Sequence, residues 1–355
     1  MKSNSIMSKM LKGTGALLIG LTAGSVISTA QADEAGEINI YSYRQPFLIE
    51  PLTTAFSEQT GIKANVIFAS KGLAERIHAE GANSPADVLL TVDISRLDGA
   101  KDLDITAPVK SEVLDANIPE NFRDPDGHWY GLTTRARVIY ASKDRVPQET
   151  ITYAELADPK WKGKICTRSG QHVYTIGLLS SIIANEGEEN AREWLEGVKA
   201  NLARKPTGND RAQVKAIFAG ECDISIGNTY YMGKMMTNEK EPEQKEWANS
   251  VRILFPNTDD RGTHVNISGV QLIKNAPNKD NAVKFMEFLS SDNAQQIYAE
   301  QNFEYPVKGD VPTAELVKSW GDFKSDSLSL SKVADQRKKA SEMVDEVGFD
   351  DGPAS

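Results

Sequence analysis

Residues 37–69 read EINIYSYRQPFLIEPLTTAFSEQTGIKANVIFA, and this stretch decides the fold class. Its opening, residues 37–43, is a β-branched run of period two, which predicts a strand. The apolar residues that follow recur at helical spacing until Gly61, and residues 63–69 return to a strand pattern. A strand, a helix and a second strand in this order predict a parallel sheet with helices on its faces.

The same alternation continues along the chain. Ser70 is the expected N-cap of the next helix, and residues 86–92 form an almost wholly apolar strand of the kind buried on both faces. Residues 128–143 read as one long extended stretch, which we interpret as a strand that crosses between two lobes. Strands and helices then alternate again, and residues 250–256 and 265–273 are the expected return crossing.

A chain that leaves one lobe, builds a second and returns has two connecting strands and a cleft between the lobes. This is a hinged binding architecture. We therefore predict a two-lobed α/β fold in which each lobe is a mostly parallel sheet flanked by helices, and two hinge strands join the lobes. The predicted divisions are a signal peptide (1–32), a first lobe (33–134 and 257–300), a second lobe (135–256), and C-terminal helices packing on the lobes with a loose tail (301–355).

The first residues have the pattern of a secretory signal peptide. Lysines without any acidic residue precede an apolar run at 15–27, and Ala30-Gln31-Ala32 follows as a small-residue cleavage site. The apolar run is short for a membrane span, although an uncleaved anchor is the alternative. We expect export, cleavage after Ala32 and a soluble mature chain.

The chain is acidic. It holds 40 lysines and arginines against 50 aspartates and glutamates, and its formal net charge is −10. Loss of the signal peptide removes lysines and makes the mature chain more acidic still. A surface of this sign disfavours nucleic acid and anionic lipid as main partners. The remaining length suffices for two domains of ordinary size.

Two cysteines, Cys166 and Cys222, lie in strand-like segments of an exported chain. Neighbouring parallel strands would bring them within bridging distance, and an oxidising compartment favours a disulfide, which we expect. Two separate buried thiols are the alternative, because the sequence gives no Cα separation.

Enzyme signatures are absent from the sequence, which has no Walker loop, no G-x-S-x-G, no H-E-x-x-H and no C-x-x-C. The four histidines are scattered and never four residues apart. His172 follows Cys166 by six residues, but the strand position of Cys166 and the second cysteine argue against a thiol nucleophile. We expect no enzymatic activity, since a secreted hydrolase would need a nucleophile and base that we do not find.

The tyrosines have unusual positions. In CDISIGNTYYMGKM, residues 222–235, Tyr230 and Tyr231 follow the end of a predicted strand, where ligands bind in open α/β sheets. At a strand-to-helix turn, with Gly227 freeing the backbone, both side chains can face one point, whereas on a strand they would face opposite ways. Tyr174 lies at the start of another helix in the same predicted lobe, again just past a strand.

Three converging phenols suit a trivalent metal ion that prefers oxygen. A free phenol ionises at a pKa of ~10. A strongly charged cation displaces its proton, and the resulting hard, anionic oxygen suits Fe3+ rather than Zn2+ or Cu+. The positive ends of helices would help to hold such anions. The alternative is an organic ligand that Tyr230 and Tyr231 contact by stacking and hydrogen bonding.

Three arginines face the same predicted opening. Arg135 and Arg137 share one face of the long extended stretch, and Arg44 ends the first strand. Their planar guanidinium groups suit a carboxylate, carbonate or phosphate. The alternatives are a surface salt bridge for Arg137 and an ion pair between the lobes for Arg44. The corresponding alternative function is the binding of a small oxyanion or organic acid without metal.

Five stretches together resemble the periplasmic ferric-ion-binding proteins of ABC importers, the bacterial transferrin-like group with the type II periplasmic-binding-protein fold. The likeness runs over most of the mature chain, and GNTYY is its most specific part. The stretches are IYSYRQPFLIEPLTTAFSEQTGI (40–62), NSPADVLLTVDISRL (83–97), GLTTRARVIYASKD (131–144), WKGKICTRSG (161–170) and GECDISIGNTYYMGKM (220–235).

The resemblance implies roles for particular residues. Tyr230 and Tyr231 would ligate Fe3+ with Tyr174 as a third ligand, and Arg44 and Arg135 would hold a synergistic carbonate or bicarbonate. It also implies a periplasmic protein that delivers iron to an inner-membrane ABC permease, without nucleic acid as a partner, and we expect a monomer.

The sequence departs from the pattern of this family at several positions. Some members have a histidine in the first loop and a glutamate after the third strand, where this chain has Gln45 and either Val92 or Asp93. The remaining coordination would come from the anion, from water or from another tyrosine, for which Tyr43 is the candidate. Members with a further tyrosine directly after that histidine have Pro46 here.

Overall fold

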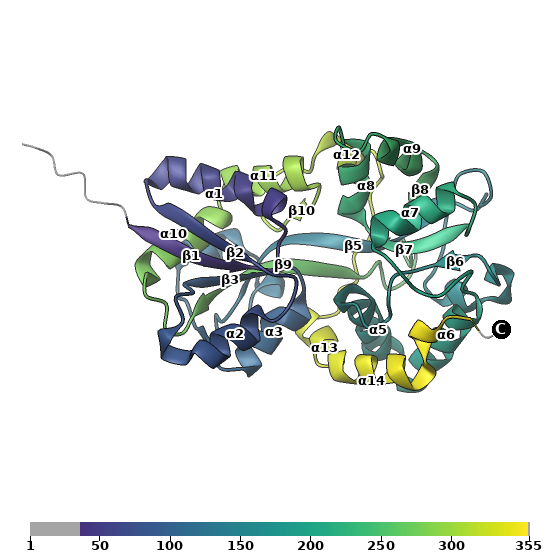
Figure 1. Cartoon of the computed structure of the whole chain (residues 1–355), viewed down its shortest axis with the longest axis horizontal. Helices are drawn as coiled ribbons and strands as arrows, with labels where there is room; N and C mark the ends of the chain where they lie inside the picture. Colours follow the sequence, from purple (N-terminus) through teal and green to yellow (C-terminus); the bar gives the residue numbers. More distant parts are fainter. Residues whose placement is uncertain (1–35, 354–355) are drawn as a thin grey trace, which may run out of the picture. The chain divides into compact units, whose positions relative to one another are not determined.

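The first three strands lie side by side and run parallel, as the sequence predicts (Figure 1). The computed structural model describes residues 36–353. β1 (Glu37–Ser42) lies between β2 (Lys63–Phe68) and β3 (Val88–Thr91) and pairs with both. Helices connect these strands, which confirms the α/β class.

Helices cover both faces of these strands, because successive side chains along a strand point to opposite faces. Ile38 and Ile40 pack on one face with Phe56, whereas Tyr41 packs on the other face with Ile77. On the first face lie α1 (Pro46–Thr60), α10 (Lys279–Leu289) and α11 (Asp292–Asn302), and on the second lie α2 (Leu73–Glu80) and α3 (Ile94–Asp102).

The start of α2 differs from the prediction. The residue that precedes the helix is Gly72, whose φ of 82° turns the chain into the first turn at Leu73. Such a left-handed conformation costs glycine little and most other residues much more. The predicted N-cap, Ser70, lies outside the helix, and its carbonyl accepts a hydrogen bond from Arg96. The N-cap prediction for Ser70 is therefore wrong.

Two long strands cross the middle of the sheet. β5 (Tyr130–Ser142) and β9 (Val265–Ile273) are buried along their whole length and pair antiparallel, with Arg135 opposite Asn266. They confirm the predicted pair of connecting strands. Residues 250–256 are not part of the return crossing, because β8 (Val251–Leu254) pairs with the C-terminal end of β5.

A second group of strands lies beside the C-terminal half of β5. β6 (Ile165–Cys166) and β7 (Ile224–Asn228) are parallel, whereas β7 and β8 run antiparallel to β5. The predicted parallel pairing is thus found among β1–β3 and between β6 and β7. Every pair that includes β5 or β9 is antiparallel, and these two long strands run in opposite directions to each other. The short strands β4 (Thr106–Ala107) and β10 (Tyr305–Pro306) also pair antiparallel.

The helices of the second group follow the predicted alternation, and a disulfide joins two of its segments. Cys166 and Cys222 are bonded, with Cα atoms 5.8 Å apart and a sequence separation of 56. Closing a loop of this size stabilises a fold by about 4 kcal/mol, mainly by restricting the unfolded chain. The helices are α5 (Val173–Glu186), α6 (Glu188–Ala200), α7 (Asp210–Phe218), α8 (Thr229–Met236) and α9 (Glu243–Asn249).

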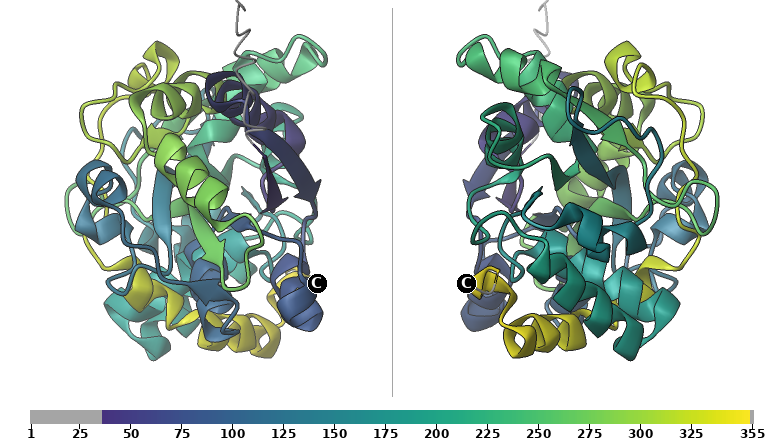
Figure 2. Two further views of the ribbon diagram at one scale, coloured as in Figure 1. Left: turned by 90° about the vertical axis from the view of Figure 1, so that its left-hand side faces the viewer. Right: turned by 90° about the vertical axis from the view of Figure 1, so that its right-hand side faces the viewer.

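The C-terminal segment packs on the rest of the chain. Its helices are α12 (Glu315–Lys318), α13 (Leu330–Ala334) and α14 (Arg337–Val347). Of these, α13 and α14 run beside α5, yellow against teal in Figure 2. Phe349 is buried, and the carboxylate of Asp350 accepts hydrogen bonds from Ser169 and from the N–H of Gly170. The predicted loose tail is therefore wrong up to Gly352, because these contacts fix it.

The described residues 36–353 belong to one compact unit. The predicted lobe boundaries stay predictions, and the predicted signal peptide at 1–32 lies outside the described residues. Within 36–353, no helix is long and apolar enough to cross a membrane. The remaining helical elements are α4 (Glu112–Asn117) and 3₁₀ helices at Gly81–Asn83, Glu120–Phe122, Ala154–Ala157, Pro159–Trp161 and Phe349–Asp351.

Candidate metal centre

Three tyrosines lie together at the starts of two helices, and we call them the tyrosine cluster. Tyr174 lies in the first turn of α5, and Tyr230 and Tyr231 lie in the first turn of α8. The hydroxyls of Tyr174 and Tyr230 are 3.3 Å apart, and the rings of Tyr230 and Tyr231 stack with centroids 4.3 Å apart. All three side chains are buried. The fold thus gathers the three phenols that the sequence singles out.

Close packing between β7 and β5 determines where α8 begins. A Cβ on Gly227 would lie 2.1 Å from the ring of Tyr140, so only glycine fits at this position. The Tyr140 hydroxyl donates a hydrogen bond to the carbonyl of Asn228, and α8 starts at the next residue. Because this end of β7 is fixed, the first turn of α8 presents its two tyrosines to Tyr174.

Burial keeps the phenols of α8 neutral. Burial, followed by the neighbouring Tyr174, raises the pKa of Tyr230 well above its usual value and the pKa of Tyr231 to about 12. Ionisation of these groups therefore requires a compensating cation, which the positive helix ends only partly supply. Within the described chain, no group of three or more histidine, cysteine, aspartate or glutamate side chains could hold a metal ion.

Two buried arginines, Arg137 and Arg168, share the carboxylate of Asp210 beside the ring of Tyr174. We call these three residues the Asp210 cluster. Arg137 Nη1 lies 2.7 Å from Asp210 Oδ2, and Arg168 Nη1 lies 2.8 Å from Asp210 Oδ1. The Cζ atoms of Arg168 and Arg137 lie 5.2 Å and 5.8 Å from the ring centroid of Tyr174.

The Asp210 cluster changes the interpretation of one predicted residue and adds two others. Arg137 is only 2% exposed, so a surface salt bridge is the wrong alternative for it. Its role in anion binding stays a prediction, and its carboxylate partner is Asp210. Sequence reasoning missed Arg168 and Asp210. A charged residue two positions after Cys166, just past a predicted strand, is the signal that could have pointed to Arg168.

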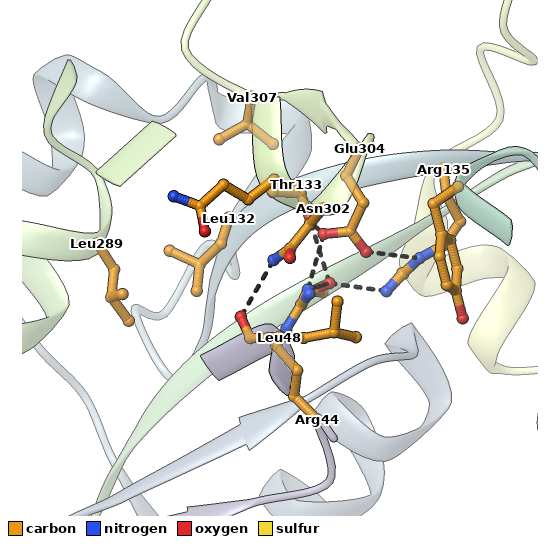
Figure 3. Close-up of polar contacts among 12 residues, drawn as sticks. Arg44, Leu48, Leu132, Thr133, Arg135, Leu289, Asn302, Glu304 and Val307 are labelled. Atoms are coloured by element: carbon orange, nitrogen blue, oxygen red, sulfur yellow. Dashed lines mark hydrogen bonds and ion pairs between the residues drawn. The ribbon is translucent and has the colours of Figure 1, made fainter. Parts of the chain in front are cut away.

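Arg44 and Arg135 meet at Glu304, and we call these three residues the arginine cluster (Figure 3). Arg44 Nη2 lies 2.9 Å from Glu304 Oε2, and Arg135 Nε lies 3.7 Å from Glu304 Oε1. Both arginines also donate to the hydroxyl of Ser268, and Thr133 donates to the carboxylate at 2.9 Å. Sequence reasoning missed Glu304, which lies 260 residues from Arg44.

The arginine cluster has hydrogen-bond donors in excess. Burial would raise the pKa of Glu304, but the charges of Arg44 and Arg135 outweigh burial and lower it, so Glu304 is a carboxylate at neutral pH. Arg44 Nη1 and Arg135 Nη1 are buried and have no hydrogen-bond partner among residues 36–353. The cluster therefore holds two guanidinium cations against one carboxylate, together with N–H groups that have no partner in the described chain. Such an arrangement can accommodate a further anion.

Tyr43 lies apart from the tyrosine cluster. Its hydroxyl accepts a hydrogen bond of 3.0 Å from the N–H of Ala74, and Arg96 lies over its ring. His172, in contrast, lies edge-on to Tyr174 with ring centroids 4.7 Å apart, and its Nδ1 accepts the N–H of Tyr174. Burial foremost lowers the pKa of His172 to about 3, so the ring is neutral beside the phenols.

The sequence is similar to a known protein family and to characterised relatives. Residues 83–324 match the family described as bacterial extracellular solute-binding protein. Iron uptake protein A1 of Synechocystis is 48% identical over 318 residues, which cover 89% of this chain and 88% of that protein.

Solved structures agree with this assignment. The apo ferric ion-binding protein A of Pasteurella haemolytica is 53% identical, with a TM-score of 0.85 over 88% of this chain and 98% of that one. A Trichodesmium protein solved in complex with iron and citrate ligands is 45% identical, with a TM-score of 0.83 over 88% of this chain and 100% of that one. The chain belongs to the bacterial extracellular solute-binding proteins.

Proposed function

We propose that this chain is a periplasmic solute-binding protein that captures Fe3+ through the phenolates of Tyr174, Tyr230 and Tyr231. The observation that carries the proposal is the convergence of three buried phenols, with the hydroxyls of Tyr174 and Tyr230 3.3 Å apart. A core would gain nothing from three hydroxyl groups placed together, whereas a hard trivalent cation gains three anionic oxygens.

Charge balance supports Fe3+ as the cargo. Three phenolates neutralise one trivalent ion, so the filled site carries no net charge into a buried environment, where an unpaired charge would be costly. The phenols are neutral before the metal enters, and they lose their protons to solvent as it binds. Fe2+ brings less charge and is softer, so it gains less from the same ligands.

A synergistic anion completes the proposed site. The buried N–H groups of Arg44 and Arg135 that lack partners in the described chain support an anion such as carbonate or bicarbonate beside the arginine cluster. Glu304 already contacts both arginines, so the anion and Glu304 would share them.

Transport rather than chemistry is the proposed role. The relatives named above are called iron uptake and ferric ion-binding proteins, which supports a role in iron transport. The proposed carrier is non-enzymatic and monomeric, and it delivers Fe3+ to an inner-membrane ABC permease. The proposed signal peptide at 1–32 would bring it to the periplasm. Closure of two lobes around the ion would follow from ligands on both sides of the cleft.

Visible absorbance tests this function. Fe3+ bound to phenolates absorbs visible light by charge transfer, so the purified protein is expected to turn orange or red with ferric citrate and to bind Fe2+ more weakly. A colourless protein with equal affinity for both ions would contradict the proposal. Binding of an oxyanion or organic acid by that colourless protein would instead support the metal-free alternative that the arginine cluster favours.

A further inference from the structure

We propose that Arg168 is a positioning residue of the iron site, whose guanidinium group holds the ring of Tyr174 and places a positive charge behind it. This inference rests on the proposed function, because it concerns Tyr174 as an iron ligand. It extends the site to a residue that lies outside the ligand set and the arginine cluster.

The contacts of Arg168 fix its guanidinium group in one place. The side chain is 9% exposed and follows β6, with Nη1 2.8 Å from Asp210 Oδ1. Its Cζ lies 5.2 Å from the ring centroid of Tyr174, within the range of a cation–π contact. Asp210 holds one side of the planar guanidinium group, and the central carbon of that group lies over the ring. Arg168 thus contacts Tyr174 through the ring.

Asp210 connects this support to the second part of the tyrosine cluster. Asp210 is fully buried at the start of α7. Its carboxylate accepts hydrogen bonds from Arg168, from Arg137 and, at 2.9 Å, from the N–H of Asn228. Asn228 directly precedes the helix that carries Tyr230 and Tyr231. One carboxylate therefore fixes the starting point of α8 and the cation behind Tyr174.

The charge of the Asp210 cluster has a spectroscopic consequence. Two arginines and one aspartate leave a net positive charge beside the Tyr174 ring. The visible transition of an iron phenolate moves an electron out of the ring towards the metal, and so away from the guanidinium group. Because a nearby cation makes this transfer more costly, loss of the cation lowers the transition energy.

Two substitutions of Arg168 separate this role from mere packing. Arg168→Met keeps most of the volume and removes the charge, so its ferric charge-transfer band is expected at longer wavelength than in the wild type. Its Fe3+ affinity is expected to fall by about threefold to thirtyfold, the range of one cation–π contact. Arg168→Lys, which keeps the charge, is expected to restore the band most of the way to the wild-type position.

Arg192→Met is the matched control. Arg192 lies on α6 and pairs with Glu346 at an exposed site, so the same substitution there is expected to leave band and affinity unchanged. If Arg168→Met does not fold, Arg168→Gln carries the same prediction, because the amide keeps a donor for Asp210 and lacks the charge. The protein used throughout is the full mature chain, loaded with ferric citrate.

The outcomes distinguish this inference from the proposed function. A wild-type protein without any charge-transfer band overturns both. A coloured wild type, with an Arg168→Met or Arg168→Gln variant whose band and affinity match it, overturns the inference alone. So does an Arg168→Lys variant whose band lies as far from the wild type as that of Arg168→Met, because charge would then not be the cause.

Discussion

The tyrosine cluster and the arginine cluster are both buried, yet they carry their charge in opposite ways. In the arginine cluster, Glu304 of the chain itself already offsets part of the cationic charge. In the tyrosine cluster, neutral phenols gather through ring stacking and one hydroxyl contact. One site holds its charge permanently, whereas the other gains charge only when a cation displaces protons.

The two clusters adjoin each other in the chain and in space. Phe303 packs with the tyrosine cluster, and the next residue is Glu304 of the arginine cluster. Gly233 of α8 packs directly on the ring of Phe303. One short segment therefore joins the proposed cation site to the proposed anion site. Substitutions in one cluster can be made without touching the other, and their effect on the other cluster can be measured.

The largest expected effect comes from the tyrosine cluster. Loss of a residue that only supports a metal ligand lowers metal affinity by about 10–100-fold. Tyr230→Phe and Tyr231→Phe each remove a ligand itself, so we expect each to lower Fe3+ affinity by more than about 100-fold. Competition with citrate measures it. Tyr130→Phe is the matched control, because the Tyr130 hydroxyl donates to the carbonyl of Val109 and its ring packs in a separate group of buried side chains. Wild-type affinity in both cluster variants would remove the tyrosines from the site.

The next effect follows from the raised pKa values of Tyr230 and Tyr231. Both phenols are protonated at neutral pH, so metal binding releases their protons and is favoured as pH rises. Each proton released lowers the apparent affinity by about tenfold for every unit by which pH falls. Titrations between pH 6 and 8, corrected for chelator protonation, are expected to show release of at least two protons. An affinity independent of pH would mean that the phenols do not ionise.

In the arginine cluster, the expected effect is on stability rather than on affinity. Glu304→Gln leaves Arg44 and Arg135 buried with little compensation, and breaking such a pair costs about 3–5 kcal/mol of unfolding free energy. Because the pKa of Glu304 is lowered in the fold, its contribution is present above the unfolded pKa and disappears as pH falls through the folded pKa. The difference from the wild type should therefore narrow in acid.

Denaturant unfolding at neutral and acidic pH measures this difference. Bicarbonate is expected to stabilise the Glu304→Gln variant more than the wild type, because the anion can replace the lost carboxylate. The exposed Glu239, which pairs with Lys245, gives the control variant Glu239→Gln. If Glu304→Gln were as stable as the wild type without added anion, Glu304 would not be the counter-charge of the arginines.

The smallest expected effect lies at the junction of the two clusters. A Cβ on Gly233 would lie 2.3 Å from the Phe303 ring, so Gly233→Ala is expected to destabilise the protein by about 1–3 kcal/mol and to weaken iron binding modestly. Gly309→Ala is the control, since nothing lies within 4 Å of a Cβ there. Thermal unfolding of both variants gives the comparison, and equal melting temperatures would show that α8 is not held against Phe303.

Local pattern was sufficient for most of the fold and for the tyrosine cluster. Strand and helix periods predicted β1, β2, β3, β5 and β9, because each depends on neighbours in sequence. The tyrosines were found because the ends of strands and the starts of helices are also local features. The misplaced start of α2 depended on the left-handed Gly72, for which the periodic pattern carries no signal.

Partners distant in sequence were out of reach of the same reasoning. Glu304 and Asp210 have no motif, and their roles follow from arginines 260 and 73 residues away. The buried position of Arg137 was missed for the same reason, since Arg137 lies on β5 and its carboxylate partner comes from α7. The packed tail near Phe349 likewise depends on α14 and on residues before α5, which no local pattern predicts.

A crystal structure of the protein loaded with Fe3+ tests the central claim most directly. We expect iron bound by the phenolate oxygens of Tyr174, Tyr230 and Tyr231, with any bound anion on the side of Arg44 and Arg135. Iron held at another place, or at this place without these three oxygens among its ligands, would contradict it.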